Sequence, residues 1–205
     1  MTTSTATTKL NPNRELVIGP DVPEHPFPIR LNGEVVKGFG RGSKELGIPT
    51  GKYHWSRAIG LPVSPMPTYY SLPFFSFSSL ANLSEDALKD LTSTLDVGVY
   101  YGWAQVGSDP TVYPMVMSLG WNPYYKNEKQ SAEVHIIHKF DQDFYGDCLR
   151  VAVMGYIRPE QNYPSLDALI EDINTDIEVA KRCLKRAAYE EVSRDALFTQ
   201  VAGTA

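Results

Sequence analysis

The feature that most constrains the fold is a series of short segments in which apolar residues recur at every second position. These segments span residues 97–104, 113–121, 133–140 and 149–157. Such alternation is typical of β-strands, because successive side chains of a strand point to opposite faces. The connections between the segments are short, which favours consecutive antiparallel pairing in a small barrel or sandwich.

The last third of the chain changes to a helical period. Ser165 is placed to cap a helix, Asp167 falls in its first turn, and basic residues crowd its end, where the helix dipole favours cations. We expect an amphipathic helix that covers one side of the barrel. A second, short helix is predicted within residues 83–95, with Ser84 as its N-cap. The apolar positions of the long helix are Leu166, Leu169, Ile170, Ile173, Ile177, Ala180 and Leu184.

Composition and charge exclude several classes of protein. Hydrophobic residues make up 42% of the 205-residue chain, enough to bury a core, and the net charge of -5 argues against a general nucleic-acid surface. The two cysteines have no metal-ligand spacing, and no stretch is apolar and long enough for a membrane span. We expect one domain over residues 26–190, with a flexible N-terminal tail at 1–25 and a C-terminal tail at 191–205.

A glycine-rich segment, GFGRGSKELGIPT, follows the first short strand. Its glycines allow backbone amides to approach an anion closely, and its polar side chains add hydrogen-bond donors. It lacks the GK[ST] ending of a Walker loop and the helix of a Rossmann fingerprint. From the residues alone, a flexible hairpin and a nucleotide-binding loop both remain open. The candidate phosphate-binding residues are Gly38, Gly40, Arg41, Gly42, Ser43, Lys44 and Gly47.

Glu133 is the candidate general base. It opens a predicted apolar strand, where a carboxylate needs a partner or a chemical role. The alternative is a glutamate at the rim of a sheet. His135 and His138 lie three positions apart, so they point to opposite faces of a strand and we interpret both as structural.

Six motifs in order carry a resemblance to a known family: GEVVKGFGRGSKELGIPT, GVYYGWAQV, PMVMSLGWNPYYKN, EVHIIHKF, DFYGDCLRV and GYIRPEQNYPSLDALIEDINTDIEVA. Over residues 33–185 the chain resembles eukaryotic-type riboflavin kinases. The resemblance implies a mostly β fold, a six-stranded antiparallel Greek-key barrel with a C-terminal helix. It also implies transfer of the γ-phosphate of ATP to the ribityl 5′-hydroxyl of riboflavin, which gives FMN and ADP.

The resemblance assigns roles to particular residues and implies partners. Glu133 corresponds to the family's catalytic base, and Thr50 and Asn82 correspond to the Thr and Asn of its PTAN signature, whose oxygens hold Mg²⁺. Zn²⁺ and Mn²⁺ are alternative metals. We expect a monomer that binds riboflavin and ATP but neither nucleic acid nor membrane, in the cytoplasm, with the mitochondrion as the alternative. A non-catalytic flavin- or nucleotide-binding barrel is the main competing function, and a flavin-dependent oxidoreductase ranks last.

The chain departs from the family inside this signature. After Pro49 and Thr50 it continues for thirty residues, 51–80, before Ala81 and Asn82 complete PTAN. The added segment contains no acidic residue, and its first codons can contain a GTAAGT splice donor while Leu80-Ala81 can contain an AG acceptor. We therefore interpret residues 51–80 as a translated, unspliced intron, with a genuine surface insertion as the alternative. This interpretation predicts that the chain as given has weak activity or none.

Overall fold

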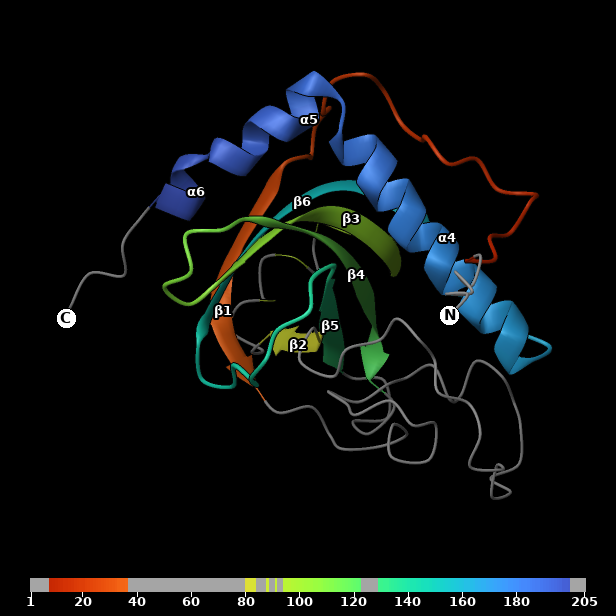
Figure 1. Cartoon of the computed structure of the whole chain (residues 1–205), viewed down its shortest axis with the longest axis horizontal. Coiled ribbons are helices and arrows are strands. Elements are labelled where there is room, and N and C mark those ends of the chain that lie inside the picture. Colours follow the sequence, from red (N-terminus) through yellow and green to blue (C-terminus); the bar gives the residue numbers. More distant parts are fainter. Residues whose placement is uncertain are drawn as a thin grey trace, which may run out of the picture.

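The computed structural model describes residues 8–36, 80–83, 88, 91, 94–122 and 129–199. Six antiparallel strands close into one barrel in the order β1-β2-β5-β4-β3-β6 (Figure 1). The predicted six-stranded antiparallel barrel is therefore confirmed. The strands are β1 (Ile29–Val36), β2 (Leu80–Leu83), β3 (Gly98–Val106), β4 (Tyr113–Asn122), β5 (Lys129–Ile136) and β6 (Cys148–Arg158).

Consecutive pairing, as predicted, holds for only part of the barrel. β3 pairs with β4 and β4 with β5, but β6 returns to pair with β1 and β3 instead of β5. The short β2 fills the place between β1 and β5. Alternation in a sequence shows which face each side chain occupies but not which strand lies beside it, so this closure could not be predicted from periodicity.

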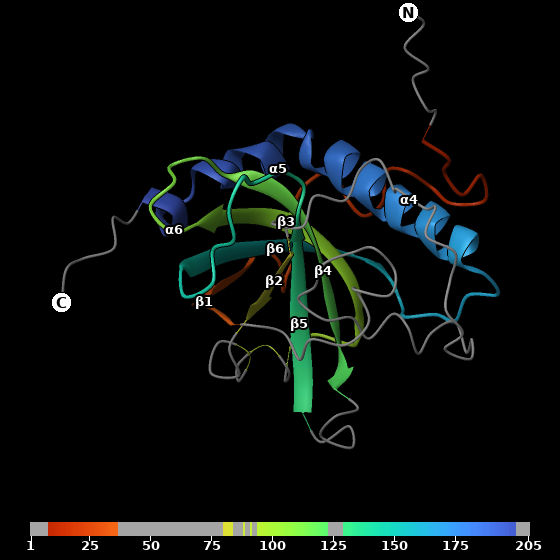
Figure 2. The same cartoon turned by 60° about the horizontal axis from the view of Figure 1, so that its bottom comes forward.

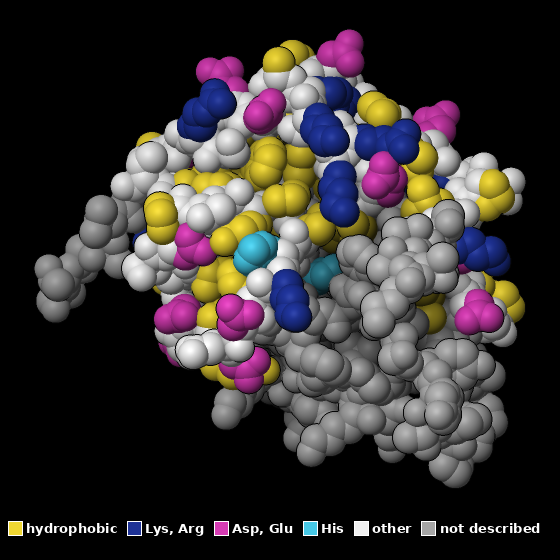
Figure 3. Space-filling view, in the orientation of Figure 1, with side chains coloured by type: hydrophobic (Ala, Val, Ile, Leu, Met, Phe, Trp, Pro, Cys, Tyr) yellow, Lys and Arg dark blue, Asp and Glu magenta, His cyan; other side chains and the backbone are white. Residues whose placement is uncertain are grey.

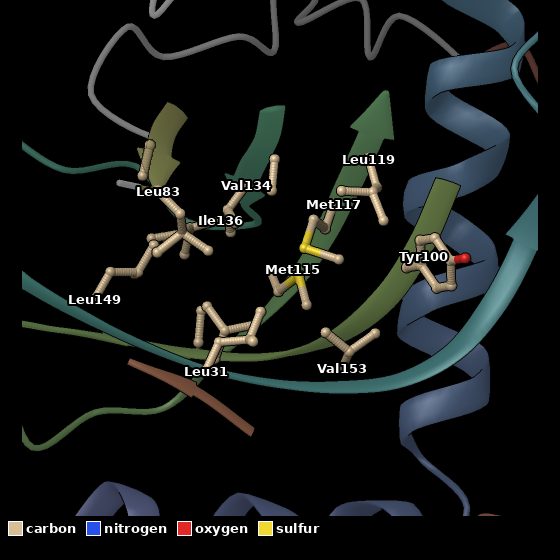
Figure 4. Packing of buried hydrophobic residues seen from close by; sticks show 14 of the residues in the cluster. Leu31, Leu83, Tyr100, Met115, Met117, Leu119, Val134, Ile136, Leu149 and Val153 are labelled. Carbon is tan, nitrogen blue, oxygen red and sulfur yellow. The ribbon is translucent and has the colours of Figure 1, made fainter. Parts of the chain in front are cut away.

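The interior of the barrel is filled by alternate residues of all six strands. Leucine, valine and methionine side chains converge there together with Tyr100 and Ile136, as the labelled residues of Figure 4 show. Burial of these side chains supplies the main stabilisation of the fold. The inward-facing residues of the strands nearest the candidate base are Ala81 and Leu83 on β2, Met115, Met117 and Leu119 on β4, and Ala132, Val134 and Ile136 on β5.

A helical layer covers one side of the barrel, as predicted (Figures 1 and 2). Helix α4 (Leu166–Leu184) begins where the Ser165 hydroxyl accepts a hydrogen bond from the amide of Ala168, at 3.2 Å. Its buried residues Val179, Ala180 and Cys183 pack against the outer surfaces of β3, β4 and β6. In Figure 3, Lys and Arg side chains gather over this helical layer although the chain carries a net negative charge.

The C-terminal segment continues past the boundary that we expected at residue 191. After α5 (Ala187–Glu191) come a 3-10 turn, η2 (Val192–Arg194), and α6 (Ala196–Thr199). Phe198 of α6 is buried, and Asp195 accepts hydrogen bonds from the Arg30 side chain on β1. These contacts fix residues 191–199 against the barrel, a result that differs from the predicted tail.

The described part of the N-terminal segment also differs from the flexible tail that we expected. Residues 8–20 run alongside α4 (Figures 1 and 2). The backbone amide of Asn11 donates to Thr175 Oγ1 at 2.8 Å, and Arg14 lies 2.7 Å from Asp176 Oδ1. Arg186 donates to the carbonyls of Ile18 and Gly19. Single polar side chains hold this segment against α4, so its apolar residues follow no regular spacing. The sequence pattern therefore did not reveal that the segment packs on the helix.

Strand β5 begins four residues earlier and ends four residues earlier than the predicted segment 133–140. The amide of Ile137 instead donates to the Pro114 carbonyl, and the His138 ring stacks on Tyr113 at 4.3 Å between centroids. Glu133 therefore lies in the middle of a strand and not at its start. Most of the helix predicted within residues 83–95 falls outside the described residues.

Candidate active site

Glu133 is flanked on both sides by polar residues of neighbouring strands. In the strand register it lies opposite Asn82 of β2 and opposite Ser118 of β4. Directly opposed residues of antiparallel strands have side chains on the same face, with Cβ atoms about 4.5–5.5 Å apart. Their neighbours Ala81, Val134 and Met117 fill the barrel interior, so the row Asn82–Glu133–Ser118 lies on the outer face. All three of its side chains are partly buried.

The helical layer covers the outer face of the sheet on one side of this row, in the direction of His135. His135 follows Glu133 on the same face of β5 and lies opposite Val116, which packs in the cluster beneath α4. Burial lowers the pKa of His135 to about 4, with a smaller contribution from the nearby Lys181 ammonium group. The imidazole is therefore neutral at pH 7, which agrees with its interpretation as a structural residue.

On the other side of the row, in the direction of Ser131, a second carboxylate lies over the same face. Ser131 lies opposite Gly120, and a Cβ atom at Gly120 would collide with the Glu160 carboxylate. Glu160 follows shortly after the end of β6. The absence of a side chain at Gly120 thus lets the segment after β6 bring a negative charge onto the same face as Glu133.

A buried ionic network holds the end of β6, just before Glu160, against α4. The Arg158 guanidinium donates to both carboxylate oxygens of Asp176 on α4, at distances of 2.7 to 3.2 Å. Burial raises the pKa of Asp176 against the opposing effect of Arg158. Burial also opposes ionisation of Asp172, but hydrogen bonds from Asn11 and Tyr163 and the charge of Arg14 keep its pKa below the usual value.

The remaining predicted site residues lie outside the described part of the chain. These are Gly38, Gly40, Arg41, Gly42, Ser43, Lys44, Gly47 and Thr50. The described chain leads up to them at Val36, which pairs directly with Asn82. The described part of β1 therefore ends beside the row that contains Glu133.

The donor atoms of the row suit a hard divalent cation. Carboxamide and carboxylate oxygens are ligands that Mg²⁺ accepts, and Mg²⁺ usually takes its remaining ligands from water and substrate phosphates. Within residues 8–36, 80–83, 94–122 and 129–199, no three His, Cys, Asp or Glu side chains form a metal-binding group. Asn82 therefore fits a role beside a phosphate-bound metal better than a role in a zinc site built from the protein alone.

Sequence reasoning named Glu133 and Asn82 as candidate residues but did not name their neighbour Ser118. The signal for Ser118 is present, since it is the polar residue between Met117 and Leu119 in a strand that otherwise reads as apolar. Its position opposite the base depends on the β4–β5 register, which no local pattern reveals.

Comparison with known proteins identifies the family. The sequence model of the flavokinase family, described as riboflavin kinase, matches residues 25–184. The chain belongs to the riboflavin kinase family. A riboflavin kinase of Pyricularia oryzae is 43% identical over 192 residues, which cover 86% of this chain and 81% of that protein. The human riboflavin kinase is 43% identical over 172 residues, with coverage of 84% and 91%.

A solved structure supports the same family and fold. The crystal structure of riboflavin kinase from Trypanosoma brucei superposes with a TM-score of 0.58 at 25% identity, over 88% of this chain and 95% of that one. The family match ends at the last residue of α4, so α5 and α6 lie beyond it. Among the described helices, none is long and apolar enough to cross a membrane.

Proposed function

We propose that this chain transfers the γ-phosphate of ATP to the terminal ribityl hydroxyl of riboflavin, giving FMN and ADP. Membership of the riboflavin kinase family supports the reaction. The single structural observation that carries the proposal is the register that sets Asn82 directly opposite Glu133. It brings together a candidate base and a candidate metal ligand that lie 51 positions apart in the sequence.

Glu133 is the general base of this mechanism. A primary alcohol is a poor nucleophile at neutral pH, so a carboxylate in hydrogen-bond reach accepts its proton as the oxygen attacks the γ-phosphorus atom. The bond from that phosphorus to the β,γ-bridging oxygen breaks, and ADP leaves with the electron pair. The partial burial of Glu133 and its place in the middle of β5 fix the backbone from which the carboxylate extends.

Asn82 and Thr50 are the proposed protein ligands of a divalent ion, Mg²⁺, with Zn²⁺ and Mn²⁺ as alternatives. When bound, such an ion offsets the charge that develops on the transferred phosphoryl group. The backbone amides of Gly38, Gly40, Gly42 and Gly47, with Arg41, Ser43 and Lys44, are the proposed cradle for the phosphates. We place the reaction in a monomer, in the cytoplasm or the mitochondrion.

The test of the function is FMN formation by the purified chain. Riboflavin, ATP and Mg²⁺ are incubated with the protein and FMN is measured by chromatography. Glu133→Gln is expected to lower turnover at least about 100-fold. Glu34→Gln, at an exposed position of β1, is the matched control and is expected to keep wild-type turnover. Riboflavin binding without FMN formation by the wild type would support the non-catalytic barrel instead.

We also propose that residues 51–80 derive from a retained intron. Ala81 and Asn82 support this, because they pair with β5 inside β2 immediately after Leu80, the last residue of the added segment. Nucleotide sequences of the gene and its transcript across residues 50–81 test the proposal. A GT donor that begins at the second base of the Gly51 codon and an AG acceptor that spans the junction of the Leu80 and Ala81 codons are expected, and their absence would refute the proposal.

A further inference from the structure

The side of Glu133 that faces β4 has no role in the mechanism above. On that side lies Ser118, the residue directly opposed to Glu133 in the β4–β5 pair. The two inward neighbours of Ser118, Met117 and Leu119, are completely buried in the barrel core. The backbone of β4 is therefore fixed at this point, and the Ser118 side chain must lie on the outer face with Glu133.

Ser118 differs in kind from the adjacent outward positions of β4. Val116 is apolar and packs beneath α4, while Gly120 has no side chain and is covered by the Glu160 carboxylate. Of these three positions, only Ser118 offers a hydrogen-bond donor next to the base. Asn82, on the opposite side of Glu133, has its carboxamide oxygen committed to the metal in the proposed function.

We propose that Ser118 is a positioning residue, whose hydroxyl donates a hydrogen bond to the Glu133 carboxylate and holds it toward the acceptor hydroxyl. The inference rests on the proposed role of Glu133 as base. A serine hydroxyl suits this task because it can donate to a carboxylate while its short side chain loses little freedom. A second carboxylate, that of Glu160, lies on the same face, so a fixed donor also holds Glu133 in place against repulsion between the two carboxylates. No proton or phosphoryl group passes through Ser118.

The test separates positioning from binding. Single-turnover and steady-state phosphoryl transfer from [γ-³²P]ATP to riboflavin are measured for Ser118→Ala, in the full chain and in a variant lacking residues 51–80. We expect kcat to fall about 10- to 100-fold, with the KM values for riboflavin and ATP changed less than about 2-fold. Ser118→Thr, which keeps the hydroxyl on a strand-compatible side chain, is expected to restore kcat to within about 3-fold of wild type.

The control is Ser131→Ala, which removes a hydroxyl from the same face of β5 two residues from Glu133 and is expected to leave kcat unchanged. Circular dichroism melting curves check that each variant folds. A raised KM with an unchanged kcat would overturn the proposal, because it would mean that Ser118 binds a substrate. Failure of Ser118→Thr to restore kcat in a folded protein would also overturn it.

A double-mutant cycle shows whether Ser118 acts through Glu133. In a Glu133→Gln background, Ser118→Ala is expected to lower the residual rate less than about 2-fold, because the carboxylate it positions is already gone. An undiminished effect in that background would contradict the proposal. Failure of the proposed function can be told apart from failure of this inference. Wild-type turnover by Glu133→Gln alone would rule out Glu133 as the base. A normal kcat for Ser118→Ala would rule out only the role of Ser118.

Discussion

Asn82 contributes to the site through its position, which two strand pairings fix. It lies opposite Val36 of β1 and opposite Glu133 of β5, so it stands between the end of the described part of β1 and the candidate base. A neutral oxygen there can bind a cation without adding a second negative charge beside Glu133. An amide at this position fits the proposed role of Asn82 as a metal ligand.

Replacement of Asn82 by alanine should weaken the metal site without harming the barrel. We expect Asn82→Ala to lower turnover about 10- to 100-fold at low Mg²⁺, with partial recovery as Mg²⁺ is raised. The measurement is the dependence of FMN formation on Mg²⁺ concentration. Asn32→Ala, at an exposed position of β1, serves as control. An unchanged Mg²⁺ dependence of Asn82→Ala would remove Asn82 from the metal site.

At the level of single residues, the sequence indicated candidate residues of the site but not how they are arranged. Glu133 stood out because a carboxylate interrupts an apolar alternation, and Asn82 because it completes a signature after a long interruption. Ser118 and Glu160 did not stand out, because serine and glutamate are ordinary on a strand face and in a loop. Their closeness to the site arises from the strand register and from the missing side chain at Gly120.

At the scale of elements, α4 joins the N-terminal segment to the barrel. Asp176 is 1% exposed and receives Arg158 from the end of β6 and Arg14 from the N-terminal segment. The two arginines come from segments 144 residues apart, so the carboxylate connects three parts of the chain. Periodicity predicted the helix and its cap correctly, but it treats Asp176 only as a polar position.

Removal of the Asp176 carboxylate should be costly because it leaves Arg158 buried without its main partner. We expect Asp176→Ala to lower the free energy of unfolding by about 3–5 kcal/mol. Arg182→Ala, which breaks the exposed pair with Glu178 on the same helix, should change it by less than about 0.5 kcal/mol. Urea denaturation at pH 7 measures both, and equal effects of the two substitutions would contradict the network described here.

His135 makes the interface of α4 with the barrel sensitive to acid. Its pKa is about 4 in the folded protein against 6.5 for an ordinary histidine, so the unfolded chain binds a proton more readily over this range. The contribution of His135 to the free energy of unfolding is therefore fully present above about pH 6.5. This contribution, up to about 3 kcal/mol, is lost as the pH falls toward 4.

The measurement is the free energy of unfolding in urea at pH 7.5 and pH 4.5. The wild type should lose more stability between the two values than His135→Asn, which carries no titrating ring. His138→Asn, at an exposed position, is the control and should behave as the wild type does. An equal loss in wild type and His135→Asn would show that the imidazole is not the source of the acid sensitivity.

At the scale of the whole molecule, the barrel depends on β2, a strand of four residues that closes the gap between β1 and β5. The last of the added residues 51–80, Leu80, is the first residue of this strand. They separate Thr50 from Asn82 by thirty-two positions, where the family has two. A long connection costs more closure entropy and leaves the position of Thr50 less restricted than a two-residue link does.

Deletion of residues 51–80 should therefore raise activity. We expect the shortened chain to show kcat/KM at least about 10-fold above the full chain, because both proposed metal ligands would then be held on one short segment. FMN formation by the two proteins at equal concentration is the measurement. Equal turnover would mean that the segment is a harmless insertion.

The overall architecture was predictable because six motifs and two periodicities agree on it. What sequence could not supply was the closure of the barrel through β6 and β1, the docking of residues 8–20 on α4, and the helices after residue 191. Each depends on contacts between segments far apart in the chain. Such contacts leave no local period, and single hydrogen bonds determine them.

The most direct test of the account is a crystal structure of the protein with riboflavin and a non-hydrolysable ATP analogue. The terminal ribityl oxygen should lie about 2.6–3.2 Å from a Glu133 carboxylate oxygen, with the γ-phosphate on the opposite side of that hydroxyl. A complex in which the hydroxyl and the γ-phosphate meet away from the Asn82–Glu133–Ser118 row would contradict it.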